Sequence, residues 1–111
     1  MKYLFDEGQR KATGSTCYFE FQKGKFRNKL WLKDSLFLHA DIFDSHMLYE
    51  LFSDSIQGFC YYATTEVSKE QWGILAANSE VNEQWKDIIE DLRPWVEECL
   101  AKHKCFTICG I

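Results

Sequence analysis

The chain has 111 residues, of which 46% are hydrophobic and 16% aromatic, and its formal net charge is −4 at pH 7. This length fits one domain, and the apolar content is too high for a disordered chain. No apolar run reaches the roughly 20 residues that a bilayer-spanning helix needs, and Asp6 and Glu7 lie where a signal peptide has its apolar core. We therefore predict a single domain over residues 1–111 that stays in the cytoplasm and has no membrane partner.

The charges are distributed unevenly along the chain. Residues 1–33 carry a net charge of +5, residues 34–101 carry −11, and the last ten residues add +2. A separation of this kind makes a dipolar molecule with one acidic region. Because nucleic-acid binding needs a dominant basic surface, we expect no nucleic-acid partner.

Residues 17–43 predict an antiparallel meander. Apolar Cys17, Phe19 and Phe21 alternate with polar residues, which is typical of a strand with one buried face. Turn signals around Gly24 and Asp34 separate three strands. The three strands are expected at residues 17–22, 26–32 and 36–43.

Further elements are predicted on both sides of this meander. A helix is expected to follow it, with Asp44 or Ser45 as the amino-terminal cap. Residues 58–65 are rich in strand formers and predict a fourth strand. The composition of residues 3–5 and 105–109 predicts two more.

Two helices are marked in the second half of the chain. Ser68 and Gln71 form an S-x-x-Q capping box, which predicts a short helix over residues 69–77. Residues 80–102 carry the longest amphipathic pattern, and its apolar phase continues through Pro94. We therefore expect one long helix with a kink at this proline.

These elements define an α+β fold. We predict an antiparallel sheet of about four to six strands, with a short helix between strands. The long kinked amphipathic helix is expected to pack on one face of the sheet.

The polar face of the long helix is the candidate binding site. Acidic side chains on this face would form a negative ridge about 20 Å long, able to pair with the Lys and Arg residues of a basic protein. The alternative is an ordinary solvated helix face. Trp95 lies toward the edge of the apolar face, where a tryptophan can anchor an interface. The candidate partner-binding residues are Glu83, Asp87, Glu90, Asp91, Glu97, Glu98 and Trp95.

No metal, cofactor or catalytic motif is expected. The five cysteines are odd in number and irregularly spaced, so free thiols are the interpretation for a chain without an export signal. His103, Cys105 and Cys109 fall short of the four ligands of a zinc site. A second set of acidic residues surrounds the first predicted helix, the one that follows the meander, but it lacks the spacing of a calcium-binding loop. Its members are Asp41, Asp44, Glu50 and Asp54.

Two other functions stay open from the residues alone. A small ligand-binding or enzymatic domain would use a pocket between sheet and helices near His39, Cys60 and Tyr61. A self-associating module would bind through exposed aromatic side chains such as Trp95. The oligomeric state is not predicted.

In overall character the chain resembles the small immunity proteins of bacterial polymorphic toxins, including those of contact-dependent growth inhibition. The resemblance rests on the acidic helix over Glu80–Glu98, the abundant aromatics, the free cysteines and the ending Cys105-Phe106-Thr107-Ile108-Cys109. It implies a cytoplasmic, non-enzymatic antitoxin that binds one cognate toxin tightly. The acidic helix then suggests a basic partner, such as a nuclease, whose active site is occluded.

Overall fold

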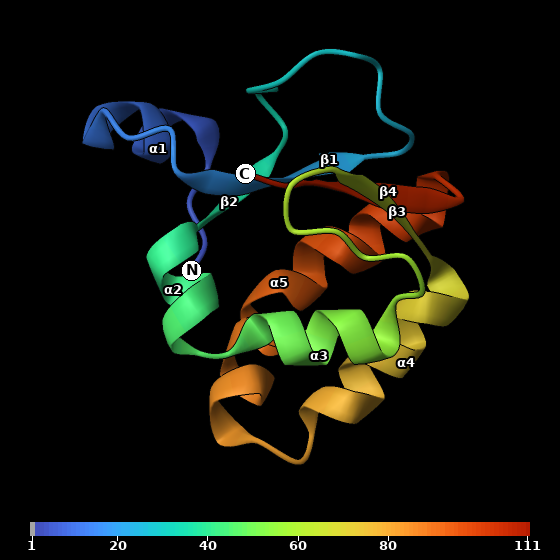
Figure 1. Ribbon diagram of the computed structural model, residues 1–111. Helices are drawn as coiled ribbons and strands as arrows, with labels where there is room; N and C mark the ends of the chain where they lie inside the picture. The colour runs from blue at the N-terminus through green and yellow to red at the C-terminus, as the bar shows by residue number, and fades with distance from the viewer. Residues whose placement is uncertain (1) are drawn as a thin grey trace.

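A four-stranded antiparallel sheet organises the chain in the computed structural model, which describes residues 2–111 (Figure 1). The spatial order is β2-β1-β4-β3. The strands are β1 (Tyr18–Lys23), β2 (Leu36–His39), β3 (Thr64–Ser68) and β4 (Cys105–Cys109). The helices within the described range are α1 (Glu7–Thr13), α2 (Ala40–Ser45), α3 (Leu48–Ser55), α4 (Lys69–Ser79) and α5 (Glu83–Lys102). The predicted α+β class is confirmed.

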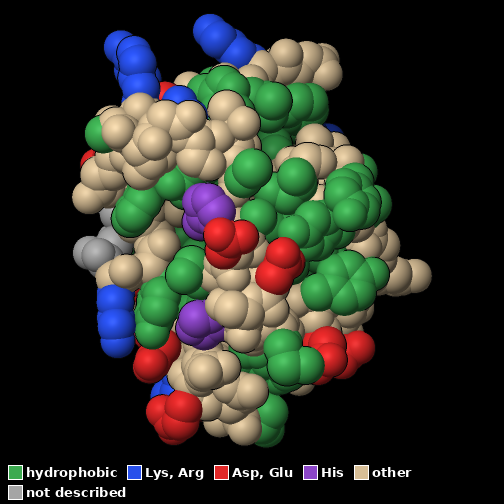
Figure 2. Space-filling model, turned by 60° about the vertical axis from the view of Figure 1, so that its left-hand side comes forward, with side chains coloured by type: hydrophobic (Ala, Val, Ile, Leu, Met, Phe, Trp, Pro, Cys, Tyr) green, Lys and Arg blue, Asp and Glu red, His purple; other side chains and the backbone are tan. Residues whose placement is uncertain are grey.

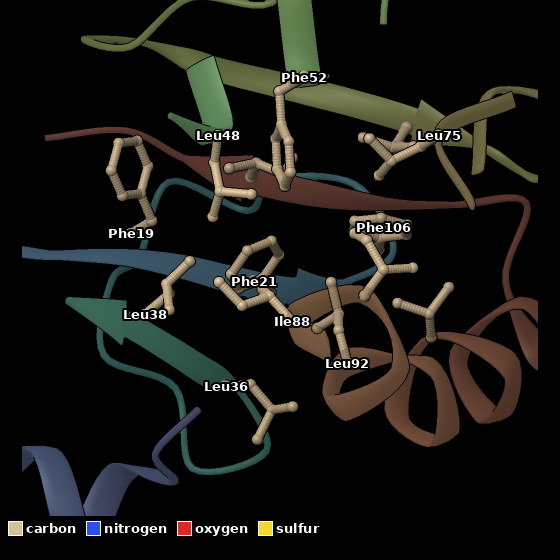
Figure 3. Close-up of a cluster of buried hydrophobic side chains, with 14 of the residues drawn as sticks. Phe19, Phe21, Leu36, Leu38, Leu48, Phe52, Leu75, Ile88, Leu92 and Phe106 are labelled. Carbon is tan, nitrogen blue, oxygen red and sulfur yellow. The ribbon is translucent and has the colours of Figure 1, made fainter. Parts of the chain in front are cut away.

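One face of the sheet packs against α3, α4 and α5. Residues opposite each other in an antiparallel pair share a face, and Phe21 lies opposite both Leu36 and Ile108. Figure 3 shows side chains of the strands meeting those of the three helices. Each fully buried side chain of this kind contributes about 1.5–3 kcal/mol through removal from water. The labelled members are Phe19, Phe21, Leu36, Leu38, Leu48, Phe52, Leu75, Ile88, Leu92 and Phe106.

The opposite face of the sheet is covered by the segment 24–35 and by α1 (Figure 1). Glu20 of β1 is buried there, and its carboxylate accepts hydrogen bonds from the backbone N–H groups of Trp31 and Leu32, both at 2.9 Å. It also accepts a bond of 2.7 Å from the Ser35 hydroxyl. The next residue on this face, Gln22, donates its side-chain amide to the Lys29 carbonyl at 2.8 Å. The sheet thus supplies hydrogen-bond acceptors and a donor for the backbone of this loop.

Helix α1 was not predicted from the sequence, although its cap is a D-x-x-Q box. Asp6 accepts from the Gln9 backbone N–H, and the Gln9 side chain accepts from that of Asp6. The Arg10 guanidinium lies 4.2 Å from the Trp31 ring centroid and binds both carboxylate oxygens of Glu7. A cation over an aromatic face is attracted by the ring, so this contact fastens α1 to the covering loop.

The predicted strand over 26–32 is wrong. Asn28 and Trp31 have backbone φ angles of 62° and 61°, which extended strands do not allow. The segment crosses over the sheet, and the Trp31 ring stacks on that of Phe37 at 5.7 Å between centroids. Burial of this aromatic pair replaces the strand ladder that the sequence pattern indicated.

Three other boundaries differ from the predictions. The strand expected over 36–43 ends at His39, because its side chain accepts from the backbone N–H of Asp41 and caps α2. Met47, with φ 56°, precedes α3, so neither Asp44 nor Ser45 is its cap. The strand expected over 58–65 begins only at Thr64.

Predictions based on strong local signals are confirmed. The capping box of Ser68 and Gln71 starts α4, and both of its hydrogen bonds are present. Strand β4 forms as expected, and residues 3–5 contribute a single bridge between Phe5 and Phe37. Helix α5 contains Pro94 but begins after an Asn82 cap, later than expected. The kink at the proline stays a prediction.

The buried carboxylate of Glu20 leads to a stability prediction. Glu20→Gln keeps the size of the side chain but replaces one acceptor oxygen by an NH2 group. This group then faces the N–H and O–H donors of the loop. We expect the free energy of unfolding to fall by about 1–3 kcal/mol. Urea denaturation measures this, with the exposed Glu66→Gln on the same face of the sheet as the matched control. Equal midpoints for the two variants would contradict the role given to Glu20.

Candidate functional site

The predicted acidic ridge on α5 is partly used within the molecule, beginning with Asp91. Its carboxylate accepts the backbone N–H groups of Lys2, Tyr3 and Leu4 at 2.9–3.1 Å. An anion that accepts several N–H groups forms strong, charge-assisted bonds. Asp91 therefore holds the start of the chain against α5 and has little capacity left for a partner.

Three more of the predicted residues are paired with the chain's own cations. Arg93 binds Glu90 through two hydrogen bonds of 2.9 and 3.1 Å and approaches Glu97 at 3.8 Å. The bond from Arg93 lowers the pKa of Glu90. Lys23, at the end of β1, lies 3.2 Å from Glu98. Exposed pairs of this kind contribute only about 0–1 kcal/mol, but they reduce the charge that a partner meets.

Glu83 and Asp87 are the members of the ridge that keep their charge unpaired. Both are exposed, and neither makes an ion pair within residues 2–111. Trp95 is only partly exposed, and its indole N–H donates to the Asp34 carbonyl at 2.9 Å. The seven predicted residues thus lie on one helix, but they do not form a continuous free acidic strip.

The residues of the alternative pocket are not brought together. His39 contacts Tyr18, with ring centroids 4.9 Å apart, whereas Tyr61 contacts Phe19 at 5.0 Å. Tyr18 and Phe19 are consecutive in β1 and point to opposite faces of the sheet. Cys60 is exposed. A shared pocket near these three residues therefore receives no support from their geometry.

Open grooves lie elsewhere on the molecule. One of about 310 Å³ lies between α4 and α5 and is lined by Lys69, Trp72, Glu97, Leu100 and Ala101. Another, of about 300 Å³, lies beside Asp54 and Trp85. Across residues 2–111, no three His, Cys, Asp or Glu side chains are grouped so that they could hold a metal ion.

A second acidic surface, which sequence reasoning considered only for metal binding, lies on α2, on α3 and on the turn that follows α3. We call it the α2–α3 face. Its members are exposed, and they are Asp41, Asp44, Met47, Tyr49, Glu50 and Tyr62. Figure 2 shows acidic and hydrophobic side chains together on the side of the molecule that includes α2, with Lys and Arg toward its margins. Exposed apolar side chains grouped with charges are typical of interaction surfaces.

The α2–α3 face is held in place from beneath. Tyr61 donates its hydroxyl to both oxygens of Asp44 at 3.1 and 3.2 Å, and its ring lies 4.9 Å from that of Tyr62. Burial raises the pKa of Tyr61 to about 12, and the bond to Asp44 adds to this effect. The phenol therefore stays protonated and keeps donating at neutral pH.

The carboxyl terminus fixes the turn that carries Tyr61 and Tyr62. Gly110 donates its N–H to the Ala63 carbonyl at 3.0 Å, and Ile111 donates to that of Tyr61 at 2.9 Å. A side chain at Gly110 would collide with the backbone of Tyr61. Only glycine, which has no Cβ, allows two backbones to approach this closely.

Comparison of the chain with family models, with curated proteins and with solved structures found no match. Within the described part of the chain, none of the helices combines the length and the apolar character that crossing a membrane requires.

The different environments of two neighbouring acidic residues lead to a second prediction. Asp91→Ala leaves three backbone N–H groups without their acceptor, so we expect a loss of about 1–3 kcal/mol in the free energy of unfolding. Asp87→Ala, one turn earlier on α5, is expected to change it by less than about 0.5 kcal/mol. Thermal or urea unfolding compares the two variants. Similar stabilities would show that Asp91 does not hold the amino terminus.

The five free cysteines lead to a third prediction, on thiol reactivity. Cys17 and Cys60 are exposed, while burial raises the pKa of Cys99, Cys105 and Cys109, the last to about 12. Because the thiolate is the reactive form, an aromatic disulfide reagent at neutral pH should modify only the two exposed thiols rapidly. Cys17→Ser combined with Cys60→Ser should remove the fast phase. Rapid reaction of a third thiol in the folded protein would contradict the assigned burial.

Proposed function

We propose that this chain is a non-enzymatic protein-binding module of the immunity type. It neutralises a basic toxin in the cytoplasm by occluding the toxin's active site, and it needs no cofactor or metal. A nuclease is one kind of toxin whose substrate groove carries the Lys and Arg residues that this proposal requires. Nucleic acid and membrane surfaces are not its partners.

The observation that carries the proposal is a set of exposed carboxylates for which the chain supplies no Lys or Arg among residues 2–111. They lie on α2 and α3, and they include Asp41, Asp44 and Glu50. Unpaired like charges on one side of a molecule repel each other and do not favour the folded state. A basic protein would neutralise them, and their field would speed its approach.

An enzymatic or small-ligand role has less support. The residues that suggested it, His39 and Tyr61, contact opposite faces of β1. The three thiols with raised pKa values are buried and are poor nucleophiles. Self-association through Trp95 is likewise weakened, because its indole N–H is already satisfied by Asp34.

The test is to capture the partner from the source organism with tagged, folded protein and to measure its activity and its association rate. We expect a basic protein whose activity is lost on stoichiometric binding. Its association rate should fall roughly tenfold or more from low to high salt, because screening removes the attraction. A partner that is acidic, or that stays fully active when saturated, would overturn the proposal.

A further inference from the structure

We infer that the α2–α3 face, and not the α5 ridge, is the docking surface, and that its occupant is a segment of a partner protein presenting Lys or Arg beside apolar side chains. This inference rests on the proposed function and names the site that performs it. It moves the contact from the helix that the sequence indicated to a surface whose carboxylates were considered from the sequence only as metal ligands.

Lys and Arg are absent from the segment of the chain that carries the α2–α3 face. Residues 34–68 contain six Asp or Glu and no Lys or Arg. Asp41 lies 3.7 Å from the His39 ring, and Asp44 is bound by the neutral phenol of Tyr61. On α5, by contrast, Arg93 neutralises carboxylates within one turn on either side. A cation brought by a partner therefore competes with no Lys or Arg among residues 34–68, and beside Asp41 it meets the His39 ring.

The α2–α3 face also exposes three large apolar side chains to water. Met47, Tyr49 and Tyr62 are 57, 51 and 76% exposed. Tyrosine buries a large area at a low cost in conformational entropy, and methionine adapts to irregular surfaces. Water contact with these side chains is unfavourable, so their burial by a partner would contribute to binding. Close to Glu83 and Asp87 in the sequence, Val81 in the turn before α5 is 84% exposed, and it is a smaller side chain than tyrosine or methionine.

The exposed tyrosines of the α2–α3 face are held in place by contacts with other aromatic rings. The Tyr49 ring lies 6.0 Å from Phe59, which stacks on Phe43 at 6.1 Å, and Phe43 contacts Tyr61 at 5.7 Å. Tyr62 is joined to the same set through Tyr61. These aromatic contacts continue into the core, so the exposed Tyr49 and Tyr62 side chains pack against buried rings. A preordered surface loses less entropy on binding.

The charge decides which occupant fits. Nucleic acids and anionic lipid surfaces carry the same sign as the α2–α3 face and are repelled. Two copies of a chain with a net charge of −4 also repel each other at long range. A basic protein segment is attracted, and its apolar side chains can cover the exposed tyrosines and methionine. The occupant is therefore a cationic and apolar protein segment.

The fifth prediction uses a defined probe, a synthetic peptide in which Lys alternates with Leu and Trp, added to the full-length isotope-labelled chain. We expect amide shift changes at residues 41–50 and 59–62, and none along 83–98. The same peptide with Glu in place of Lys should not bind. Shifts centred on α5, shifts spread over the whole surface, or no binding would each overturn the inference.

Two matched variants complete the test. The first combines Asp41→Lys, Glu50→Lys and Tyr62→Ala. The second combines Glu83→Lys, Asp87→Lys and Val81→Ala, and therefore makes the same change in charge and removes one exposed apolar side chain. We expect the first to weaken both the peptide and the captured partner by at least about tenfold, and the second to change either by less than about threefold.

The outcomes separate the inference from the proposed function. If the α5 variant loses the captured partner and the α2–α3 variant keeps it, the docking surface is wrong while the immunity-type function stands. If the captured partner is not basic, the proposed function fails. Dimers in sedimentation that dissociate in the first variant, or binding of phosphatidylserine vesicles by the unaltered chain, would assign the surface to another occupant and overturn the inference.

Discussion

The buried carboxylate of Glu20 is the interaction on which the two-sided architecture depends. It accepts two backbone N–H groups and one hydroxyl from the loop that covers the sheet. Without such an acceptor, the buried backbone of this loop would lack partners, at a cost of about 1–3 kcal/mol for each group. With it, β1 is covered on both faces, by helices on one side and by the loop with α1 on the other.

This covering loop also explains the charge separation of the molecule. Six of the eight Lys and Arg residues before residue 34 lie in α1 or in this loop, on one side of the sheet, whereas Lys2 and Lys23 lie against Asp91 and Glu98 of α5. The acidic residues 34–101 include α2 to α5, and the core-forming helices lie on the other side (Figure 1). The charge separation seen in the sequence is therefore largely kept in space, with most of the cations on the loop side and the acidic helices on the other.

Local signals predicted much of the fold, and long-range contacts decided the rest. The box of Ser68 and Gln71 and the apolar stripe of α5 involve neighbouring residues, so a single sequence suffices to find them. Segment 26–32 was predicted as a strand because it lies between two turn signals, but it is held across the sheet by its contacts with Glu20 and Phe37. These partners lie outside the segment, and no local pattern shows them.

The candidate site was less predictable for the same reason. A helical wheel correctly places the acidic residues of α5 on one side, but it cannot show that the carboxylate of Asp91 meets the start of the chain 88 residues away. Nor can it show that Lys23 reaches Glu98 from β1. The spacing of Tyr49, Tyr61 and Tyr62 indicates that some of these rings face outward, but only tertiary packing decides that Tyr49 and Tyr62 are the exposed ones.

The fold requires little of the segment that joins α2 to α3 beyond a sharp turn between two buried side chains. Phe43 and Leu48 are fully buried on either side of Met47, so the chain must turn sharply between two short helices. The left-handed conformation of Met47 makes this turn at a cost of roughly 1 kcal/mol, which glycine would avoid. The fold therefore explains the backbone at Met47 but not its exposed side chain. An exposed methionine beside tyrosine and carboxylates is a side chain that the proposed partner segment could cover.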